Sequence, residues 1–589
     1  MPDALPIWDL TDLYADNSTS IHLDLNIAKK QTEKLVQYEG RLSQMTGAEL
    51  AVVIADYQSI SERLSRIISH ADLQFAADMA NPQTGQHAQG MKEKISGFSS
   101  QLLFIELELA AIDEDRFQQA LSDPDFYFFL PWLSRLRAFA PHQLETRLEQ
   151  MLVERAPAGR NAWVRLFDET ATALRFSFQG TEVTEAEILN KLSDPSADIR
   201  KEAGQSLSGV MQSNQRLFSL ILNVIAKDKE IEDRWRGFDR PVSSRNLAND
   251  VDDTTVDSLV GAVTASMPNI AHRYYKLKAG WMGSDEIPWW DRNAPLPEND
   301  DRRFNWSDAQ QIVTDAFNGF DQPMALVAQR FFDRNWIDAE VRQGKASGAF
   351  SHPTVPSAHP YILMNFDGRA RDVMTLAHEM GHGIHQVLAA DKGYLMADTP
   401  LTLAETASVF AEMLAFQTLV DKAPNDASRR FLLAGKVEDM LNTVVRQIAF
   451  HNFETAFHDA RKSGEVSAEA LSDLWMQTQT QALGPAVRLD DSYRPIWAYI
   501  PHFVHTPFYV YAYAFGDCLV NALWQNYQVK SAADKLVFSE QYIQLLKAGG
   551  TKRYNEALEP FDLNPADASF WNMGLDMIAG MIDELESLS

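Results

Sequence analysis

Three histidines and a glutamate stand close together in the segment LAHEMGHGIHQ, residues 376–386. His378 and His382 are four residues apart, so on a helix they lie one turn apart on the same face, with Glu379 beside them. This H-E-x-x-H pattern is typical of two imidazole ligands to a metal ion with a carboxylate next to the ion. The pattern predicts a metal site, for which the rest of the chain must supply a third ligand.

The third histidine of this segment, His385, is a poor candidate for that ligand. Two helical turns place it about 10 Å along the axis from His378, which is too far for one ion on an unbroken helix. The pattern with a third histidine six residues beyond the second is also absent, because Leu388 occupies that position. We therefore assign His385 to packing or to hydrogen bonding beside the metal ligands.

A second segment, residues 399–420, offers carboxylates on an otherwise apolar helical face. It begins with Thr-Pro, a helix start signal, and carries Glu405 and Glu412 on one side. Buried carboxylates are costly unless they are paired or bound to a metal. We predict that Glu405 is the third ligand and that Glu412 accepts a hydrogen bond from a ligating imidazole. The alternative to metal binding is that one or both of these glutamates form an ion pair with an arginine such as Arg446.

Glu379 has a chemical role if the histidines bind zinc. Zinc lowers the pKa of its water towards about 7, and a carboxylate beside it takes the proton as the water attacks a carbonyl. The same carboxylate then passes the proton to the leaving amine. If the histidine pair is accidental, Glu379 is a solvated helix residue.

Most segments up to about residue 345 carry apolar residues at helical intervals and predict long helices. A break near residues 181–197 predicts an N-terminal helical lobe over residues 1–190 and a catalytic domain over residues 191–589. No flexible linker joins them, so the lobes are expected to pack together. The Trp-rich segment 287–306 is polar and turn-forming, and predicts a loop.

Residues 344–368 break the helical rhythm with glycines, prolines and a short apolar run. They predict a small sheet directly before the histidine helix. The strand Ser347–Phe350 could hold an extended peptide at its edge by main-chain hydrogen bonds, which makes Gly348, Ala349 and Phe350 candidate substrate-binding residues. A purely structural hairpin is the alternative.

A late segment, residues 499–518, is rich in groups that could donate hydrogen bonds to a developing oxyanion. These groups are His502, His505, Tyr509, Tyr511 and Tyr513. The apolar run that follows is too long for a strand and favours a helix entered at Pro507. A buried tyrosine stripe that belongs to the core is the alternative.

The composition narrows the class of protein. Hydrophobic residues make up 45% of the chain and charged residues 23%, as in an ordinary folded protein. The net charge of −28, without a basic cluster, argues against nucleic acid as a partner. A single cysteine, Cys518, excludes intramolecular disulfides, and the N-terminus has no secretory signal pattern. We expect a cytoplasmic protein with no membrane-spanning segment.

With these motifs, the chain resembles the thimet oligopeptidase family of zinc peptidases, and within it the oligoendopeptidase F branch. The resemblance runs from PIWDLTDLY through HPYILMNFDGRARDVMTLAHEMGHGIHQ and ETASVFAEM to IPHFVHTPFYVYAYAFG. The resemblance implies one zinc ion per chain, bound by His378, His382 and Glu405, with Glu379 as general base.

The resemblance also implies that a histidine and a tyrosine of the late segment stabilise the oxyanion. By motif these are His502 and Tyr511, although the shorter spacing here leaves Tyr509 and Tyr513 open. The implied fold is mostly α, a large two-lobed zincin-like peptidase with a deep substrate channel and a small β-sheet next to the H-E-x-x-H helix. Such a channel admits short peptides and excludes folded proteins.

The sequence thus predicts a cytoplasmic zinc endopeptidase that acts on oligopeptides. A zinc carboxypeptidase of similar helical fold is the first alternative, and it would need a cationic group for the substrate carboxylate. An inactive homologue that only binds peptides is the second. The oligomeric state is left open, a homo-oligomer included.

Overall fold

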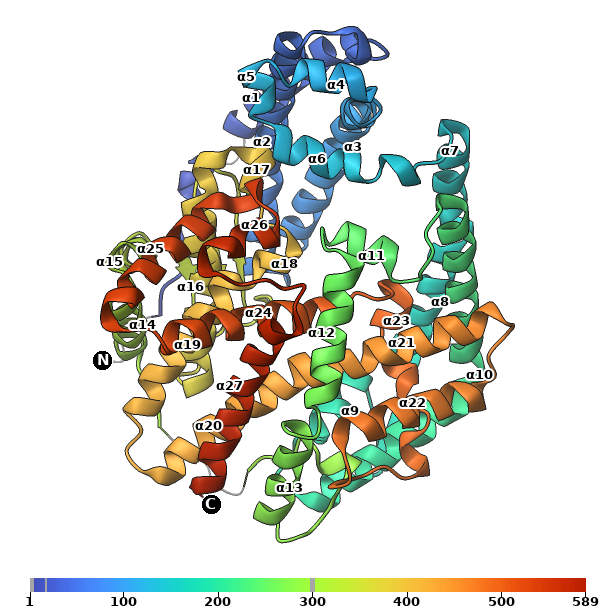
Figure 1. The fold of residues 1–589 in the computed structure, drawn as a ribbon, viewed down its shortest axis with the longest axis vertical. Coiled ribbons are helices and arrows are strands. Elements are labelled where there is room, and N and C mark those ends of the chain that lie inside the picture. Colours follow the sequence, from blue (N-terminus) through green and yellow to red (C-terminus); the bar gives the residue numbers. More distant parts are fainter. Residues whose placement is uncertain (1–4, 16–18, 297–301, 589) are drawn as a thin grey trace. The chain divides into compact units, whose positions relative to one another are not determined.

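The protein is described here from a computed structural model that covers residues 5–15, 19–296 and 302–588. Helices account for 73% of the chain and the sheets are small, which confirms the predicted mostly-α class. The chain forms two compact units, each built from three segments (Figure 1). The first unit is Met1–Ala140, Asp301–Lys422 and Tyr527–Asn564, and the second is Pro141–Asp300, Ala423–Asn526 and Pro565–Ser589. These units cut across the division near residue 190, which stays a prediction.

The first unit contains two groups of helices and the sheet that adjoins the histidine helix. Its N-terminal helices are α1 (Thr19–Leu35), α2 (Gly47–Ala77), α3 (Pro82–Ala110), α4 (Glu114–Ala120), α5 (Pro124–Tyr127) and α6 (Leu130–Ala138). The others are α14 (Trp306–Phe320), α15 (Gln322–Asp333), α16 (Ala370–Ala389), α17 (Tyr394–Ala397), α18 (Leu401–Ala404), α19 (Thr406–Asp421), α25 (Ala532–Ala548) and α26 (Tyr554–Leu558). Helix α2 begins with a capping box, in which Thr46 and Glu49 each bond the other's backbone N–H.

The histidine helix, α16, is held between other helices and a three-stranded sheet. Helix α19 packs along it, and the two lie side by side in Figure 1. The strands are β4 (Ile337–Asp338), β5 (Phe350–His352) and β6 (Tyr361–Leu363), in the order β4-β6-β5. Strand β6 is parallel to β4 and antiparallel to β5, which places β5 at an edge. The predicted sheet next to α16 is therefore confirmed.

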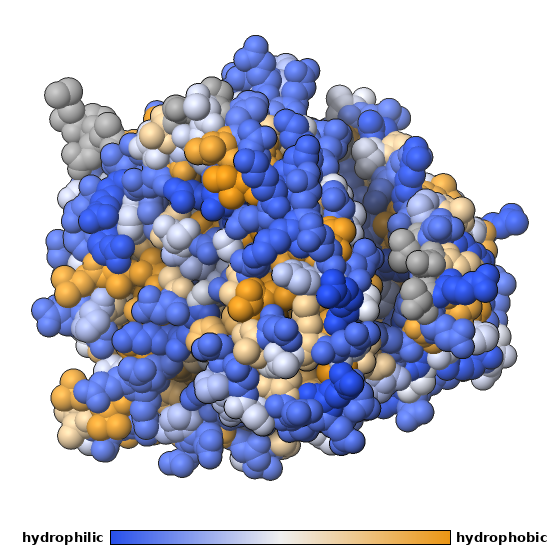
Figure 2. Space-filling model, turned by 90° about the horizontal axis from the view of Figure 1, so that it is seen from above, coloured by the Kyte–Doolittle hydropathy of each residue, from blue (hydrophilic) through white to orange (hydrophobic). Residues whose placement is uncertain are grey.

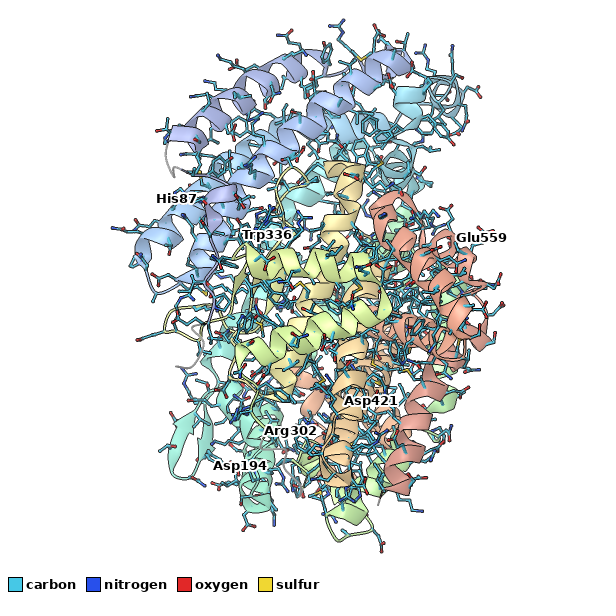
Figure 3. All side chains as sticks on the ribbon, turned by 90° about the vertical axis from the view of Figure 1, so that its left-hand side faces the viewer. His87, Asp194, Arg302, Trp336, Asp421 and Glu559 are labelled. Atoms are coloured by element: carbon cyan, nitrogen blue, oxygen red, sulfur yellow. The ribbon has the colours of Figure 1, made fainter. Side chains whose placement is uncertain are left out.

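Aromatic packing anchors this sheet within the first unit. Trp336 is 1% exposed and stacks on His359, with ring centroids 3.6 Å apart. Figure 3 shows α14 and α15 side by side and Trp336 just beyond the end of α15. Phe331 of α15 meets the same indole edge to face, at 5.1 Å. Aromatic pairs of this kind add to the burial of apolar area and fix the strands against the helices.

The second unit is built around the long helix α10 (Ala197–Arg236), which ends at Gly237 in the left-handed conformation. Its other helices are α7 (Thr146–Arg155), α8 (Arg160–Ala173), α9 (Glu185–Lys191), α11 (Ser243–Ala248), α12 (Asp253–Ser266), α13 (Ala271–Trp281), α20 (Asp426–Met440), α21 (Arg446–Lys462), α22 (Ala468–Leu483), α23 (His502–His505), α24 (Tyr511–Gln528, whose last two residues belong to the first unit) and α27 (Ala568–Ser587). Two short sheets pair β1 (Phe176–Phe178) with β2 (Thr181–Val183), and β3 (Ile287–Pro288) with β7 (Val487–Arg488).

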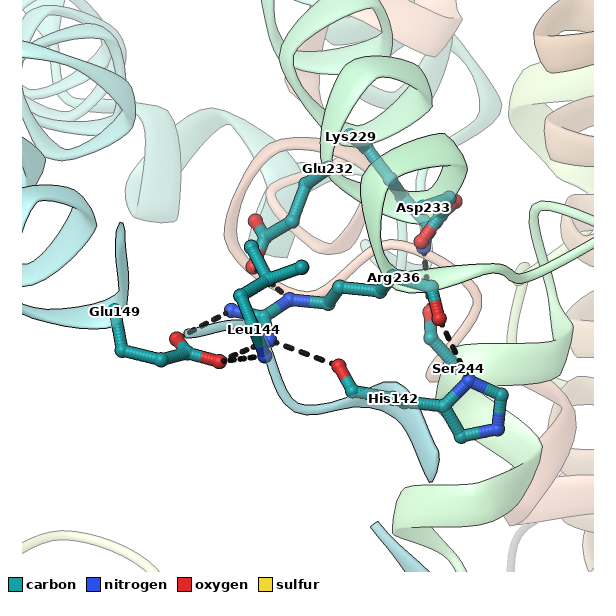
Figure 4. Close-up of polar contacts among 8 residues, drawn as sticks. All are labelled: His142, Leu144, Glu149, Lys229, Glu232, Asp233, Arg236 and Ser244. Carbon is teal, nitrogen blue, oxygen red and sulfur yellow. Dashed lines mark hydrogen bonds and ion pairs between the residues drawn. The ribbon is translucent and has the colours of Figure 1, made fainter. Parts of the chain in front are cut away.

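A polar network at the end of α10 ties this helix to α7 (Figure 4). The Arg236 guanidinium donates to both carboxylate oxygens of Glu149 at 2.7 and 2.9 Å, and to Glu232 at 2.8 Å. The imidazole of His142 meets the Arg236 carbonyl at 2.9 Å. Bidentate arginine–carboxylate pairs fix orientation as well as distance, so this contact sets the angle between the two helices.

One face of the molecule shows how hydrophilic and hydrophobic residues are distributed on the surface. The face drawn in Figure 2 is mostly hydrophilic, with hydrophobic residues in small scattered groups. One helical stretch, Thr402–Asp421, has the length and hydropathy to cross a membrane, but 72% of that window is buried inside the protein, as in a core helix. A bent pair, Pro82–Ala110 with Glu114–Ala120, passes the same criterion only if it is counted as one span.

Candidate metal centre

Two neighbouring helices bring His378, His382 and Glu405 together in the first unit. The imidazoles lie one turn apart on α16, and Glu405 occupies the break between α18 and α19. One oxygen of Glu405, Oε2, is 3.5 Å from Nε2 of His378 and 3.5 Å from Nε2 of His382. Among the described residues these three form the one group of at least three histidine or carboxylate side chains whose ligand atoms all lie within 4.8 Å of one another.

These distances match what a tetrahedral zinc ion requires. Ligand atoms about 2.1 Å from an ion stand about 3.4 Å apart along the edges of a tetrahedron. Two imidazole nitrogens and one carboxylate are also a donor set that zinc accepts, with a fourth position left open. Burial lowers the pKa of His382 to about 4, so this ring is neutral, as a metal ligand must be. The residues therefore fit a zinc ion.

Glu412 fixes the orientation of one of these imidazoles. Its Oε2 lies 3.1 Å from Nδ1 of His378. Burial acts to lower the pKa of His378, but the hydrogen bond and the charge of Glu412 raise it overall. With Nδ1–H donated to Glu412, the Nε2 lone pair of His378 is directed at the position between the ligands. The predicted contact of Glu412 with an imidazole is thus present, and Arg446 instead donates to Tyr499.

Glu379 lies next to the ligands in a low-polarity environment. The residue is 7% exposed, and burial raises the pKa of its carboxyl to about 7. The charge of His378 and a hydrogen bond from the Ser351 backbone N–H oppose this shift, because both favour the carboxylate. A carboxyl whose pKa is near neutral can both accept and return a proton at physiological pH. The link to Ser351 also connects this carboxylate to strand β5.

His385 lies apart from the ligand group, in a buried position. Its Nε2 is 3.2 Å from the Thr399 hydroxyl, and burial lowers its pKa to about 4. This placement agrees with the hydrogen-bonding and packing role predicted for it. The glycine between the ligands, Gly381, permits the close approach of the helices, because a Cβ there would lie 2.4 Å from the Ala407 carbonyl oxygen.

The predicted strand Ser347–Phe350 starts three residues too early. Strand β5 begins at Phe350, and Gly348 precedes it with a φ of +83°, a left-handed conformation that interrupts a strand. The Gly348 carbonyl accepts a hydrogen bond from the Asn365 side chain at 3.1 Å. Of the three candidate substrate-binding residues in this segment, only Phe350 lies in the edge strand, while Gly348 and Ala349 form the turn before it.

The late segment of the second unit places His502 against Tyr513. Nε2 of His502 is 3.2 Å from the Tyr513 hydroxyl, and the ring of Tyr509 packs on Tyr513 with centroids 5.3 Å apart. Tyr513 is 39% exposed. Burial lowers the pKa of His502, and the nearby Arg446 charge lowers it further, so the imidazole is neutral near pH 7.

Tyr511 is placed differently from its neighbours. It is fully buried, and its hydroxyl accepts a hydrogen bond from Asn249 at 2.9 Å. Residues two positions apart on an α-helix differ by about 200° around its axis, so Tyr511 and Tyr513 face nearly opposite sides of α24. The helix begins at Tyr511 and not at Pro507, because Phe508 adopts a φ of +61°. The structure therefore pairs His502 with Tyr513, and the catalytic role of each of these residues stays a prediction.

Two supporting contacts were missed at the level of sequence. The Ser408 hydroxyl donates to Oε2 of Glu405 at 2.6 Å, and the side chains of Ser351 and Gln386 bond each other at 3.0 Å. The first had a signal, since Ser408 stands three residues after Glu405, within reach on one helical turn. The second joins β5 to α16 across 35 residues and had none.

Comparison with known proteins agrees with this fold. Residues 191–577 match peptidase family M3, and residues 108–176 match the oligopeptidase F N-terminal family. The chain therefore belongs to peptidase family M3, and it is a peptidase that acts on oligopeptides.

Relatives over nearly the full length carry oligopeptidase names. The chain is 24% identical to the group B oligopeptidase PepB of Streptococcus agalactiae, over 99% of this chain and 96% of the relative. It is 25% identical to an oligoendopeptidase F homologue of Lactococcus lactis, over 99% and 97% of the two chains. The solved oligoendopeptidase F of Enterococcus faecium has the same fold, with a TM-score of 0.70, 19% identity and coverage of 97% and 99%.

Proposed function

We propose that this peptidase is a zinc-dependent endopeptidase that cleaves internal bonds of short oligopeptides. The observation that carries the proposal is the convergence of His378, His382 and Glu405 at tetrahedral spacing beside the buried carboxyl of Glu379. These residues would hold one zinc ion. When bound, zinc would polarise the carbonyl of the substrate and make an adjacent water molecule more acidic.

Glu379 supplies the proton transfers. Its carboxylate takes a proton from the attacking water and then delivers that proton to the nitrogen of the leaving amine. Its buried position keeps the carboxyl pKa close to the working pH, so both transfers are accessible. Glu412 supports the reaction indirectly, because it holds the His378 ring with Nε2 towards the ligand position.

Strand β5 supports binding of an extended substrate. It lies at an edge of its sheet beside α16, where its Ser351 contacts Glu379 through the backbone N–H and Gln386 through the side chain and the carbonyl. A substrate that adds at Ser351 has to replace these contacts. A peptide that adds to this edge would make main-chain hydrogen bonds, which accept many side chains. This mode fits a peptidase that degrades peptides of varied sequence.

We retain His502 and a tyrosine of the late segment as donors to the oxyanion. The contact of His502 with Tyr513 favours Tyr513 over the buried Tyr511. Tyr513→Phe is expected to lower kcat by about 100-fold or more with little change in KM, whereas Tyr511→Phe is expected to act through stability. A deep channel and a cytoplasmic location also stay predictions.

Internally quenched peptides test the endopeptidase activity. Peptides blocked at both ends are expected to be cleaved as readily as free ones, and a chelator is expected to abolish cleavage until zinc is restored. Cleavage of free peptides alone would favour the carboxypeptidase alternative. Zinc-loaded protein that leaves every peptide in the panel intact would favour the inactive homologue.

A further inference from the structure

The second unit contains a partly open cavity that includes none of the proposed metal-binding residues. Its volume is about 260 Å³. The cavity is lined by leucines of α9 and α10, by Trp289 and Trp290, and by the polar side chains of Arg292, Arg446, Tyr493 and Tyr499. Among the described residues, two arginines and no carboxylate line it, in a chain with a net charge of −28.

Arg292 has no anionic partner in the part of the chain that the structure describes. Its Nε donates to the Asn293 side chain at 3.4 Å, and its guanidinium lies against the Tyr493 hydroxyl. No Asp or Glu forms an ion pair with it there. Arg292 is partly exposed. A partly buried guanidinium without an anion is less favourable than a paired one, so a bound anion would stabilise it.

Arg446 also has no anionic partner among the described residues. It is the first residue of α21, directly after a π-helical turn, Leu441–Val445, of the kind that often marks a functional site. Its Nη2 donates to the Tyr499 hydroxyl at 2.7 Å, and its guanidinium lies over the Phe450 ring. Within the described residues it has no ion pair, and Tyr499 has no acceptor for its own proton, which leaves that proton available to a ligand.

Two acidic groups close to Arg292, Asp291 and Glu438, are paired with other residues. Asp291, between the tryptophans and Arg292, accepts from the buried Arg200 at 2.7 Å. Glu438, whose charge reaches Arg292, is bonded to Lys278 and to the Tyr274 hydroxyl. The two cavity arginines are therefore not neutralised by these carboxylates.

The apolar walls include the indoles of Trp289 and Trp290, whose planes meet at 71°. The indole N–H of Trp289 donates to the Ser492 hydroxyl at 2.9 Å, which fixes that ring. Both tryptophans pack on Gly204 of α10, where a Cβ would lie 2.9 Å from Trp290 and 3.3 Å from Trp289. A fixed aromatic wall beside forked donors selects a ligand with a planar apolar body and an anionic end.

We propose that this cavity binds a small organic carboxylate with a flat apolar body, held by Arg292 and Arg446 at its charged end and by the tryptophans along its length. The planar guanidinium matches a carboxylate by two parallel hydrogen bonds. The ligand is either a free aromatic acid or the C-terminal residue of a peptide, which share this chemistry. None of the cavity residues belongs to the metal group, although the charge of Arg446 reaches His502.

Isothermal titration of the full-length protein tests the proposal with four probes. N-acetylphenylalanine stands for a peptide end, phenylacetate for a free acid, N-acetylphenylalanine amide for the uncharged control, and inorganic phosphate for a non-specific anion. At least one of the two acids is expected to bind with a Kd near or below about 1 mM, and the amide about tenfold more weakly or worse. The tighter acid identifies the source of the ligand.

Variants locate the binding. Arg292→Met and Arg446→Met are each expected to weaken binding about tenfold or more, while Arg165→Met, which removes an exposed pair with Glu169, leaves it unchanged. Arg292→Lys keeps the charge if the Met variant fails to fold, and is expected to weaken binding by losing the fork. Four results would each overturn the proposal. Three concern the probes: the acid and the amide bind equally, neither acid binds saturably, or phosphate binds more tightly than both acids. The fourth is loss of binding in His382→Ala but not in the arginine variants.

Discussion

Gly381 sets the distance between the two helices that carry the metal ligands. It lies on α16 between His378 and His382, where a Cβ would be 2.4 Å from the Ala407 carbonyl oxygen and 2.7 Å from Cα of Ser408. Both contacted atoms belong to backbone, so no side chain can rotate out of the way. In the variant Gly381→Ala, α16 and the start of α19 must separate, and Glu405 stands directly before α19.

The size of the effect follows from these distances. Carbon atoms in ordinary contact are about 3.5 Å apart, so the helices must move by about 1 Å. Overpacking of this kind costs about 1–3 kcal/mol, which exceeds the gain of up to about 1 kcal/mol that alanine brings to a helix. Metal–ligand distances tolerate only about 0.2 Å, so the same movement is expected to lower zinc affinity more than tenfold.

Two measurements on Gly381→Ala check this reasoning. Chemical denaturation of the metal-free protein gives the loss of stability, and a competition titration with a zinc chelator gives the affinity. Gly97→Ala is the matched control, because Gly97 lies in α3 with nothing within 4 Å of its Cβ position. The control is expected to gain about 0.5–1 kcal/mol and to bind zinc normally. A Gly381→Ala protein as stable as its parent and equal to it in zinc affinity would refute the argument.

Three further perturbations have defined outcomes. Glu412→Gln keeps a hydrogen-bond acceptor for His378 but removes the charge, so zinc affinity is expected to fall about 10- to 100-fold in the same titration. Glu454 is buried and accepts from the Phe508 N–H, and burial raises its pKa to about 8. The folded state thus keeps a proton that the unfolded state loses above about pH 4.5, so stability falls as the pH rises from there to 8. Glu454→Gln removes this pH dependence. The stability of the variant relative to wild type is therefore expected to rise between pH 4.5 and 8, by at most about 5 kcal/mol at 1.4 kcal/mol per pH unit. Denaturation curves between pH 5 and 9 measure this difference, and a difference that does not change with pH would contradict the argument. Removal of zinc by a chelator is expected to lower Tm, and zinc is expected to restore it, because a ligand that binds the folded state stabilises it; an unchanged Tm would count against a bound metal.

The metal group was predictable from sequence because it depends on local spacing. The period of a helix puts His378 and His382 on one face, and the apolar stripe of the next helix makes Glu405 and Glu412 conspicuous. The contact of Glu412 with His378 follows from the same stripe, since the carboxylate on it has to meet a cationic or donor group.

The parts that were wrong or missed depend on backbone conformation and on contacts between distant segments. The left-handed residues Gly348 and Phe508 move the starts of β5 and α24. Tyr513, one of the tyrosines that the sequence left open, lies beside His502, and which tyrosine acts stays a prediction. The Trp-rich segment 287–306 was predicted as a loop, yet its first residues form β3 and bury two indoles, while residues 297–301 lie outside the described residues. The cavity that these indoles line joins α9, α10, residues 289–293, Arg446 and residues 493–499, which no local pattern connects.

Peptide cleavage by Glu379→Gln, measured together with its zinc content, tests the central claim most directly. The substitution keeps the size of the side chain and leaves His378, His382 and Glu405 untouched. We predict one zinc ion per chain, as in wild type, a cooperative thermal unfolding transition that shows the variant is folded, and cleavage of internally quenched peptides reduced by at least about 100-fold. Zinc-loaded Glu379→Gln protein that cleaves these peptides at the wild-type rate would contradict the assignment of Glu379 as the group that transfers the proton.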